Sequence, residues 1–294
     1  MLALEADVDL DEDGAPISRY TPGDRLPGDC LAGERLGIGQ RCETWLAWSP
    51  QLWCPVVVKF PRPHQMTHPR ARQSLGREVA ALGGNLHPGL ARLYEDGTQA
   101  PEPYVVVEFI DGIALDDEID ENGAFEPHEI ALLATQLLAA LRTVHARGLA
   151  HVDIKPANIV LANGRPVLLD FGSSRAIGAS QPPGKPVGSP GYAGPDLERC
   201  EPISAAMDLF GLGATLYETM TGLAAFDPDL AAADRPALTA LPGSPLADLV
   251  MRLIDPDPGV RPDLDSALRA FGDIAQETGE PAWPEWAQPT ATRT

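Results

Sequence analysis

The chain has 294 residues, 44% of them hydrophobic, so it is long enough to bury one large core or two smaller ones. Its formal net charge of -20 argues against binding to nucleic acid or to an anionic membrane surface, because both would repel it. The sequence shows neither a signal-peptide pattern nor the roughly 20-residue apolar run of a membrane-spanning helix. We therefore expect a soluble, cytoplasmic chain with no membrane span and no nucleic-acid partner.

The N-terminal part of the sequence changes character near residue 29. Residues 1–28 are acidic and rich in turn residues, which predicts a flexible leader that serves as a solubilising tail or, alternatively, as a regulatory docking segment. From residue 29 to residue 110, short apolar runs separated by Gly, Pro and polar clusters predict strands. One helical stretch near Arg70–Leu82 interrupts them. This part is predicted to be a small, sheet-rich lobe.

The remainder of the chain is predicted to be mostly helical. Glu126-Pro127 is a favoured helix start, and apolar residues then recur at three- and four-residue spacing as far as Val144. Further helices are expected near residues 204–220, 245–253 and 264–274. Residues 279–294, with Trp283 and Trp286, form a tail that either folds back onto the domain or stays loose.

Lysine is scarce in this chain, since 19 of the 22 basic side chains are arginine. An ammonium group is a compact point charge and a guanidinium group is a planar fork, so a site shaped for one rejects the other. Lys59 lies in an apolar run, and Lys155 lies in the segment His151–Asn158. Both contexts suggest phosphate handling. The third lysine, Lys185, is interpreted as a solvated loop residue.

A hairpin is predicted immediately after the Lys155 segment. Asn163-Gly164 is a strong signal for a two-residue turn, because both residue types tolerate positive φ. Such a turn places Asn158 opposite Leu169, with Asp170 one residue beyond. The side-chain oxygens of Asn158 and Asp170 are then predicted to lie close together. Two hard oxygen ligands of this kind suit magnesium, which also accepts water and phosphate oxygens.

These motifs, with Asp170-Phe171-Gly172, resemble those of the eukaryotic-like (Hanks-type) bacterial serine/threonine protein kinases. The likeness follows the family's order from about Leu31 to about Ala275. It implies an α+β, bilobal protein-kinase-like fold, with a small antiparallel-sheet N-lobe carrying one main helix and a larger, mostly helical C-lobe. The expected divisions are a leader over 1–28, the N-lobe over 29–110, the C-lobe over 111–278 and a tail over 279–294.

The resemblance also implies roles for individual residues of the C-lobe. Asp153 is expected to accept or orient the proton of the substrate hydroxyl, and Lys155 to neutralise the transferring phosphoryl group. Lysine followed by Pro156 is the serine/threonine form of this loop. Asn158 and Asp170 are expected to hold Mg²⁺, with Mn²⁺ as an alternative.

A nucleotide site is implied as well. Lys59, paired with Glu78 of the predicted helix, is expected to hold the α- and β-phosphates of ATP. A glycine-rich loop, Leu36–Thr44, precedes Lys59 in the sequence, and it has Cys42 where the family has a third glycine. Two remaining glycines still allow the backbone to approach phosphates closely. The residues expected to bind ATP are Leu36, Gly37, Gly39, Lys59, Val107, Glu108, Ile110 and Val160.

Two further departures from the family pattern affect the activation segment. Gly194-Pro195-Asp196 replaces the usual Ala-Pro-Glu, so an ion pair between Asp196 and Arg261 is expected to be looser than usual. Asp208 resembles the buried acid that anchors the catalytic loop. Val152 stands where many members have an arginine that grips a loop phosphate, which predicts that loop phosphorylation is not the main on-switch. The segment nevertheless offers hydroxyl groups at Ser173, Ser174, Ser180 and Ser189.

The resulting functional hypothesis is an ATP- and Mg²⁺-dependent serine/threonine protein kinase acting on protein substrates, with autophosphorylation as one form of that activity. One alternative is a pseudokinase or nucleotide-binding scaffold, which the departures at Cys42, Val152 and Asp196 favour. A small-molecule kinase is a second alternative. Transfer of labelled phosphate to protein distinguishes the protein kinase from both alternatives, and ATP turnover without such labelling identifies a small-molecule kinase.

Overall fold

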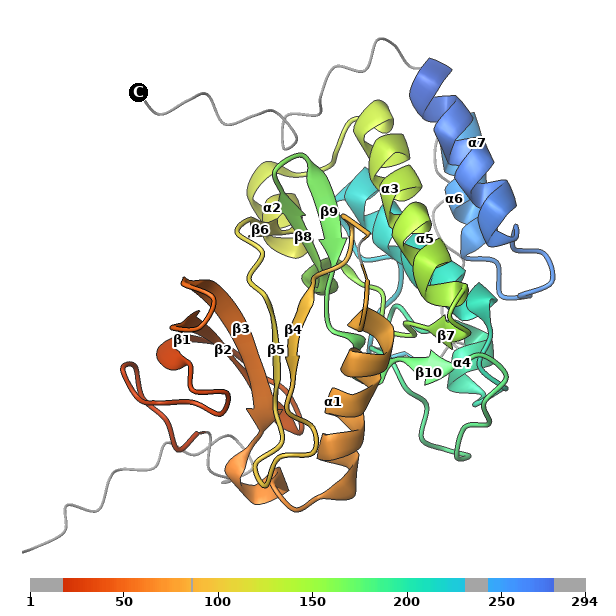
Figure 1. Cartoon of the computed structure of the whole chain (residues 1–294). Helices are drawn as coiled ribbons and strands as arrows, with labels where there is room; N and C mark the ends of the chain where they lie inside the picture. The colour runs from red at the N-terminus through yellow and green to blue at the C-terminus, as the bar shows by residue number, and fades with distance from the viewer. Residues whose placement is uncertain (1–17, 86, 231–242, 278–294) are drawn as a thin grey trace, which may run out of the picture. The chain divides into compact units, whose positions relative to one another are not determined.

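The computed structural model describes residues 18–85, 87–230 and 243–277 (Figure 1). Within them the chain forms two compact units. The first consists of the described residues up to Asn85 together with Ala91–Phe109, and the second of the remaining ones. The acidic run of the expected leader, before residue 18, and the tail with Trp283 and Trp286 lie outside the described residues.

The first unit is built on a five-stranded antiparallel sheet, with strands in the order β1-β2-β3-β5-β4. The helix α1 (Pro69–Leu82) packs against β3 and β4, which confirms the predicted helix. The register places Lys59 of β3 between Thr44 and Val105 of its two neighbours. The strands are β1 (Leu31–Ile38), β2 (Cys42–Ser49), β3 (Cys54–Pro61), β4 (Leu93–Asp96) and β5 (Val105–Glu108).

One face of this sheet is covered by the chain segment that precedes β1. Successive side chains of a strand point to opposite faces, so Phe60 lies on the face opposite Lys59. Leu26 and Cys30, which are 3% and 1% exposed, pack on the Phe60 face, and Tyr20 packs against the same cluster. The expected flexible leader over residues 1–28 is therefore wrong for residues 20–28. The turn-forming and acidic residues around Leu26 are typical of an exposed, flexible segment, so the sequence pattern did not predict that Leu26 is buried. The buried cluster contains Leu26, Cys30, Ala32, Trp45, Ala47, Val56, Val58, Phe60 and Val106.

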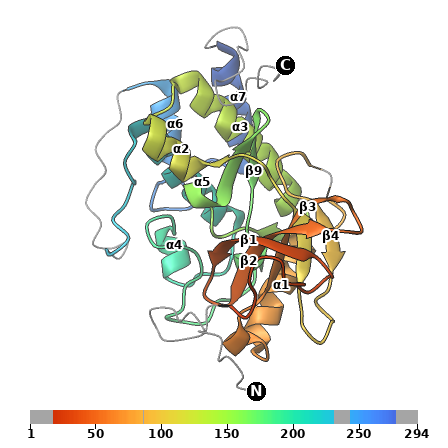
Figure 2. The ribbon, with the colours of Figure 1, turned by 90° about the vertical axis from the view of Figure 1, so that its left-hand side faces the viewer.

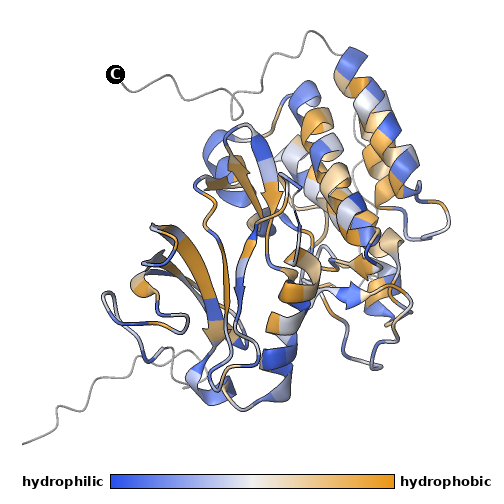
Figure 3. Ribbon diagram, in the orientation of Figure 1, coloured by the Kyte–Doolittle hydropathy of each residue, from blue (hydrophilic) through white to orange (hydrophobic). Residues whose placement is uncertain are grey.

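The second unit is mainly helical, and its long helices pack through apolar faces (Figure 3). The central helix α3 carries Leu133, Leu137 and Leu141 as fully buried side chains, and it packs against α7, on which Phe271 is also fully buried. The predicted helices are confirmed within a few residues at each end. The helices are α2 (Leu115–Asn122), α3 (Pro127–His145), α4 (Pro195–Glu198), α5 (Ala205–Thr221), α6 (Pro245–Leu253) and α7 (Leu264–Glu277).

Short strands of the second unit flank the loops that contain the expected site residues. The strands β6 (Ile113–Ala114), β8 (Ile159–Ala162) and β9 (Arg165–Leu168) form one small sheet, and β7 (Leu149–Ala150) pairs with β10 (Arg175–Ala176). The β8–β9 hairpin lies beside α3 in both views (Figures 1 and 2).

The predicted hairpin register is confirmed. Val160 faces Val167, and the Leu169 N–H donates to the Asn158 carbonyl over 2.8 Å. Asn163 and Gly164 both have positive φ, at 49° and 79°, as a two-residue turn of this type requires. The register therefore fixes the starting points of the loops that carry Asn158 and Asp170.

Among the described residues, no helix has both the length and the apolar character that a bilayer crossing demands.

Candidate active site

The lysine of β3 and the glutamate of α1 form a close ion pair in the first unit. Lys59 Nζ lies 2.6 Å from Glu78 Oε1, and the two side chains are 13% and 4% exposed. The β3 register holds the lysine on the face of the sheet toward α1, and the helix supplies the carboxylate. Glu78 thereby fixes the position of the ammonium group, which is the arrangement that the sequence predicted.

The glycine-rich loop closes the end of the β1–β2 pair beside this lysine. Gly37 pairs with Thr44, which in turn pairs with Lys59. The Gly39 N–H donates to the Cys42 carbonyl over 2.8 Å, so the residue at the third-glycine position closes the loop through its backbone. A Cβ atom at Gly37 would meet nothing within 4 Å, which leaves that side of the backbone open to a ligand. Leu36 is 47% exposed.

Four of the residues expected to bind ATP lie at the end of β5 and in the second unit. Val107 is 5% exposed and pairs with Val57, and the Glu108 N–H donates to the Arg92 carbonyl. Ile110 follows β5, and Val160 lies on β8. Their contact with ATP stays a prediction.

A buried carboxylate anchors the segment His151–Asn158 of the second unit, the loop that is expected to be catalytic. Asp208 of α5, 1% exposed, accepts hydrogen bonds from the N–H groups of His151 and Val152 at 2.8 and 2.7 Å. His145 Nε2 lies 2.7 Å from the same carboxylate. Val152 has φ 59°, a conformation that costs a β-branched residue about 1–3 kcal/mol. The Asp208 contacts hold this strained backbone in place, as the family resemblance implied for that residue.

Asp153 follows the strained residue and has a carboxylate oxygen to spare. Its carbonyl accepts a 2.8 Å hydrogen bond from Asn158 Nδ2, and its N–H donates to His151 Nδ1 at 3.2 Å. The Oδ1 atom is buried and makes no hydrogen bond. A buried carboxylate oxygen without a donor is energetically unfavourable, so this atom is available to accept a hydrogen bond.

Lys155 contacts a residue of the activation segment that the sequence did not single out as a partner. Its Nζ donates to Ser189 Oγ over 2.8 Å. Ser189 was noted only as one of several hydroxyl groups, and it lies 34 positions further along the chain, so no local pattern could connect the two. This bond joins the activation segment to the loop that carries Lys155.

The expected metal ligands meet the chemical requirements of a hard cation. Asn158 uses its amide nitrogen to bind the Asp153 carbonyl, so its amide oxygen is the atom that remains for a cation. Asp170 is exposed and has a left-handed backbone with φ 59°, just beyond the paired Leu169. Among the described residues no group of three or more His, Cys, Asp or Glu side chains could hold a metal. Two protein oxygens fit a cation that takes its other ligands from phosphate and water.

The ion pair of the activation segment is tighter than the sequence suggested. Arg261 donates to both oxygens of Asp196, at 2.9 and 3.1 Å, and the side chains are 0% and 1% exposed. The expected looseness is therefore wrong. The guanidinium group also donates to the Ala206 and Asp255 carbonyls, which brings it within reach of the shorter carboxylate.

Comparison with known proteins gives the same family. Residues 31–270 match the protein kinase domain, so the chain belongs to the protein kinase domain family. The serine/threonine-protein kinase PknB of Mycobacterium tuberculosis is 32% identical over 206 residues, which cover 67% of this chain and 33% of the relative. PknB of Mycolicibacterium smegmatis is 31% identical over 65% of this chain and 32% of the relative, and the Mycobacterium leprae protein gives the same figures. The chain spans about a third of the length of these relatives.

Proposed function

We propose that this chain is a serine/threonine protein kinase that transfers the γ-phosphoryl group of ATP to hydroxyl groups of protein substrates, itself included. The observation that carries the proposal is the buried Asp153 carboxylate oxygen without a hydrogen-bond donor, two residues before Lys155. Membership of the protein kinase domain family and the serine/threonine kinase names of its relatives support it.

The residues divide the work of the reaction between positioning and charge. Asp153 orients the acceptor hydroxyl and takes its proton, while Lys155 offsets negative charge on the transferring group. Ser189 accepts a hydrogen bond from the Lys155 ammonium group and so positions it. Lys59, fixed by Glu78, binds the α- and β-phosphates. Protein kinases obtain most of their acceleration from such positioning and electrostatic stabilisation.

We infer that Asn158 and Asp170 hold Mg²⁺, with Mn²⁺ as the alternative cation. A bound divalent ion supplies neutralisation of the phosphate charge. The chain's own contribution is to present two oxygen ligands from the ends of one hairpin, whose register is fixed by the Asn163-Gly164 turn.

The test is transfer of label from γ-labelled ATP to a generic protein acceptor with exposed serine and threonine. Asp153→Asn and Lys59→Met should each lower the rate by about 100-fold or more, because each removes a group required for the chemical step. Glu121→Gln, which changes an exposed carboxylate on α2, is the matched control and should leave the rate unchanged. ATP binding without transfer would favour a pseudokinase. ATP turnover that never labels protein would favour a small-molecule kinase.

We also propose that activity does not depend on phosphorylation of the activation segment. Val152, which replaces the phosphate-gripping arginine, is 4% exposed and sits in an apolar cluster against which Ala179 and Val187 of the segment pack. A phosphate that approached Val152 would meet these apolar side chains instead of a guanidinium group. The other members of the cluster are Ala150, Ala193, Leu197, Ile203 and Met207.

Phosphatase treatment of the purified protein tests this form of regulation. Complete removal of phosphate from Ser173, Ser174, Ser180 and Ser189, checked by mass spectrometry, should leave the transfer rate unchanged. Loss of most activity after the treatment would contradict the proposal.

A further inference from the structure

The segment before β1 forms an ordered cover on the first unit. Residues 18–30, which we term the N-terminal strap, pair with β1 through hydrogen bonds from Gly23 N–H to the Ala32 carbonyl and from Ala32 N–H to the Asp24 carbonyl, both 2.8 Å. Leu26 is buried against the sheet. The bonds join the strap to the edge strand β1, and Leu26 packs on the face opposite Lys59.

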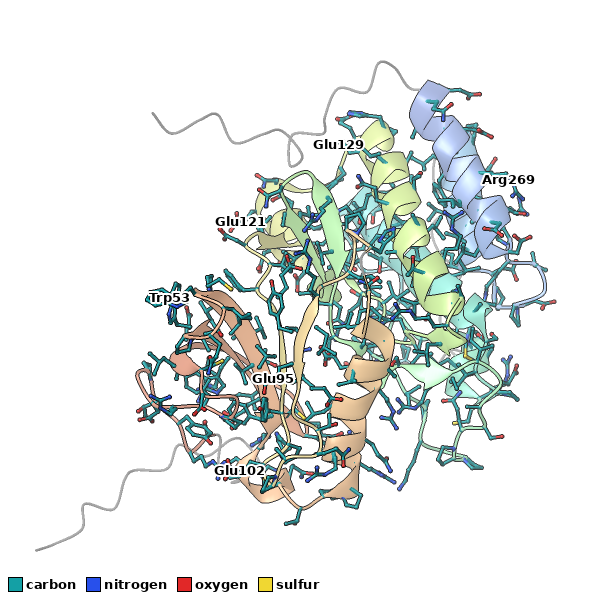
Figure 4. All side chains as sticks on the ribbon, in the orientation of Figure 1. Trp53, Glu95, Glu102, Glu121, Glu129 and Arg269 are labelled. Atoms are coloured by element: carbon teal, nitrogen blue, oxygen red, sulfur yellow. The ribbon has the colours of Figure 1, made fainter. Side chains whose placement is uncertain are left out.

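The first residues of the strap are fixed at one end of the sheet. Arg19 forms an ion pair with Glu102, in the loop before β5, and its guanidinium carbon lies 4.9 Å from the centre of the Tyr20 ring. In Figure 4, Glu102 and Trp53 lie at opposite ends of this unit. Trp53 belongs to the β2–β3 turn, whereas the glycine-rich loop joins the other end of β2.

Tyr20 contacts the strand that carries the phosphate-binding lysine. Its ring meets the ring of Phe60 edge to face, with centroids 5.2 Å apart and planes at 82°. Phe60 pairs with Glu43, which pairs with Ile38, and this row of residues closes the base of the glycine-rich loop. The neighbouring row contains Lys59. The strap therefore packs on the face of the sheet opposite Lys59. There it supports the strands that position Lys59 and the glycine-rich loop, which are the two elements expected to bind phosphate.

Glu43 is a buried residue of this interface, and its carboxyl group is only partly hydrogen-bonded. The residue is 0% exposed, and its Oε2 accepts a 2.8 Å hydrogen bond from Trp45 Nε1, but its Oε1 makes no hydrogen bond. Burial raises the pKa of the Glu43 carboxyl, against the opposing effects of Ser18 and Arg19 of the strap, Arg35 of β1 and Trp45 of β2. If the strap moved away, an ionised carboxylate here would lose the favourable effects of Ser18 and Arg19 but would gain hydration, and burial is the largest of the effects on this group.

We propose that the N-terminal strap is a releasable clamp, in which Tyr20 and Glu43 are positioning residues that set the affinity of the glycine-rich loop for nucleotide phosphates. The inference rests on the proposed function, because it assigns the loop to ATP. Docking of the strap stiffens the loop and favours nucleotide binding. Ionisation of the buried carboxyl favours release and weaker binding.

Two measurements test the clamp on the full chain. Hydrogen–deuterium exchange without nucleotide should show faster exchange of residues 36–46 in Tyr20→Ala than in wild type. Trp53→Ala, which removes a 79% exposed aromatic side chain at the other end of the sheet, should leave that exchange unchanged. Titration with a non-hydrolysable ATP analogue and Mg²⁺ should show binding to Tyr20→Ala weakened by about threefold to tenfold, as loss of one aromatic pair allows.

The variant Glu43→Gln tests whether ionisation of Glu43 favours release of the strap, because an amide cannot ionise. The ratio of the wild-type dissociation constant to that of Glu43→Gln should rise between about pH 5 and about pH 8, and titration of the nucleotide cancels in this ratio. A ratio that is independent of pH overturns the role of Glu43. Faster loop exchange in Tyr20→Ala with unchanged nucleotide affinity overturns the clamp. Unchanged loop exchange also overturns it, even if the chain proves to bind no ATP, so this failure is distinct from failure of the kinase proposal.

Discussion

Arg261 shows how one buried side chain can decide the stability of the activation segment. Its guanidinium group has no exposed surface, binds both oxygens of Asp196 and lies 4.9 Å from the centre of the Phe210 ring. Removal of one member of such a pair leaves the other charge buried and alone, which costs more than the pair itself contributes.

We expect Arg261→Ala to lower the free energy of unfolding by about 3–5 kcal/mol, measured by urea denaturation. The control is Arg199→Ala, which breaks an ion pair with Glu201 at 2.8 Å whose side chains are 56% and 43% exposed. That change should cost no more than about 1 kcal/mol, because solvent screens exposed charges. Equal losses for the two variants would contradict the assignment of the buried pair.

Glu43 gives a prediction for the pH dependence of stability. Its folded-state pKa is raised above the ordinary 4.5, so the unfolded chain ionises this group more readily than the folded one. The wild type therefore loses stability as the pH rises from the ordinary value through the folded one. Glu43→Gln lacks this loss, and its free energy of unfolding should increase relative to wild type between about pH 5 and about pH 8. A constant difference across this range would contradict the raised pKa.

At the scale of the element, the features with a local signal were the predictable ones. The Asn163-Gly164 turn determines the hairpin register, and the apolar spacing after Pro127 determines α3. The helix α2 was missed because it is short and mostly acidic, although Leu115 and Ile119 at four-residue spacing and Gly123 after its end signal it. The docking of the strap had no such signal, because Leu26 finds its partners on strands that follow it in sequence.

The activation segment offers a comparison of two glycines. Gly188 has φ 89°, and a Cβ atom there would lie 2.5 Å from the Val152 carbonyl oxygen, whereas Gly184 has φ 70° and nothing within 4 Å. An alanine would be strained at either position because both have positive φ. The two positions therefore differ only in the close approach of Gly188 to the Val152 carbonyl group. Gly188→Ala should lower the phosphate-transfer rate by about tenfold or more, through displacement of Val152 and hence of Asp153. Gly184→Ala should change it by less than about threefold. Similar rates for the two variants would show that this approach does not position the catalytic loop.

At the scale of the whole molecule, the order of motifs along the chain was enough to predict the family. The scarcity of lysine pointed to Lys59 and Lys155, and each has a specific partner within its own unit, Glu78 and Ser189. The second partner could not be predicted, because it depends on how a long segment folds back onto the catalytic loop. Contacts within a unit follow from register and helix packing, whereas the joint action of Lys59 and Asp170 on one nucleotide stays a prediction.

Calorimetric titration with ATP and Mg²⁺ tests that joint action most directly. The account predicts one site per chain, with an affinity that is weakened both by Lys59→Met in the first unit and by Asp170→Asn in the second. Lys185→Met, which changes an exposed loop lysine, should bind like wild type. Two independent sites, or an affinity that responds to only one of the first two variants, would contradict the account.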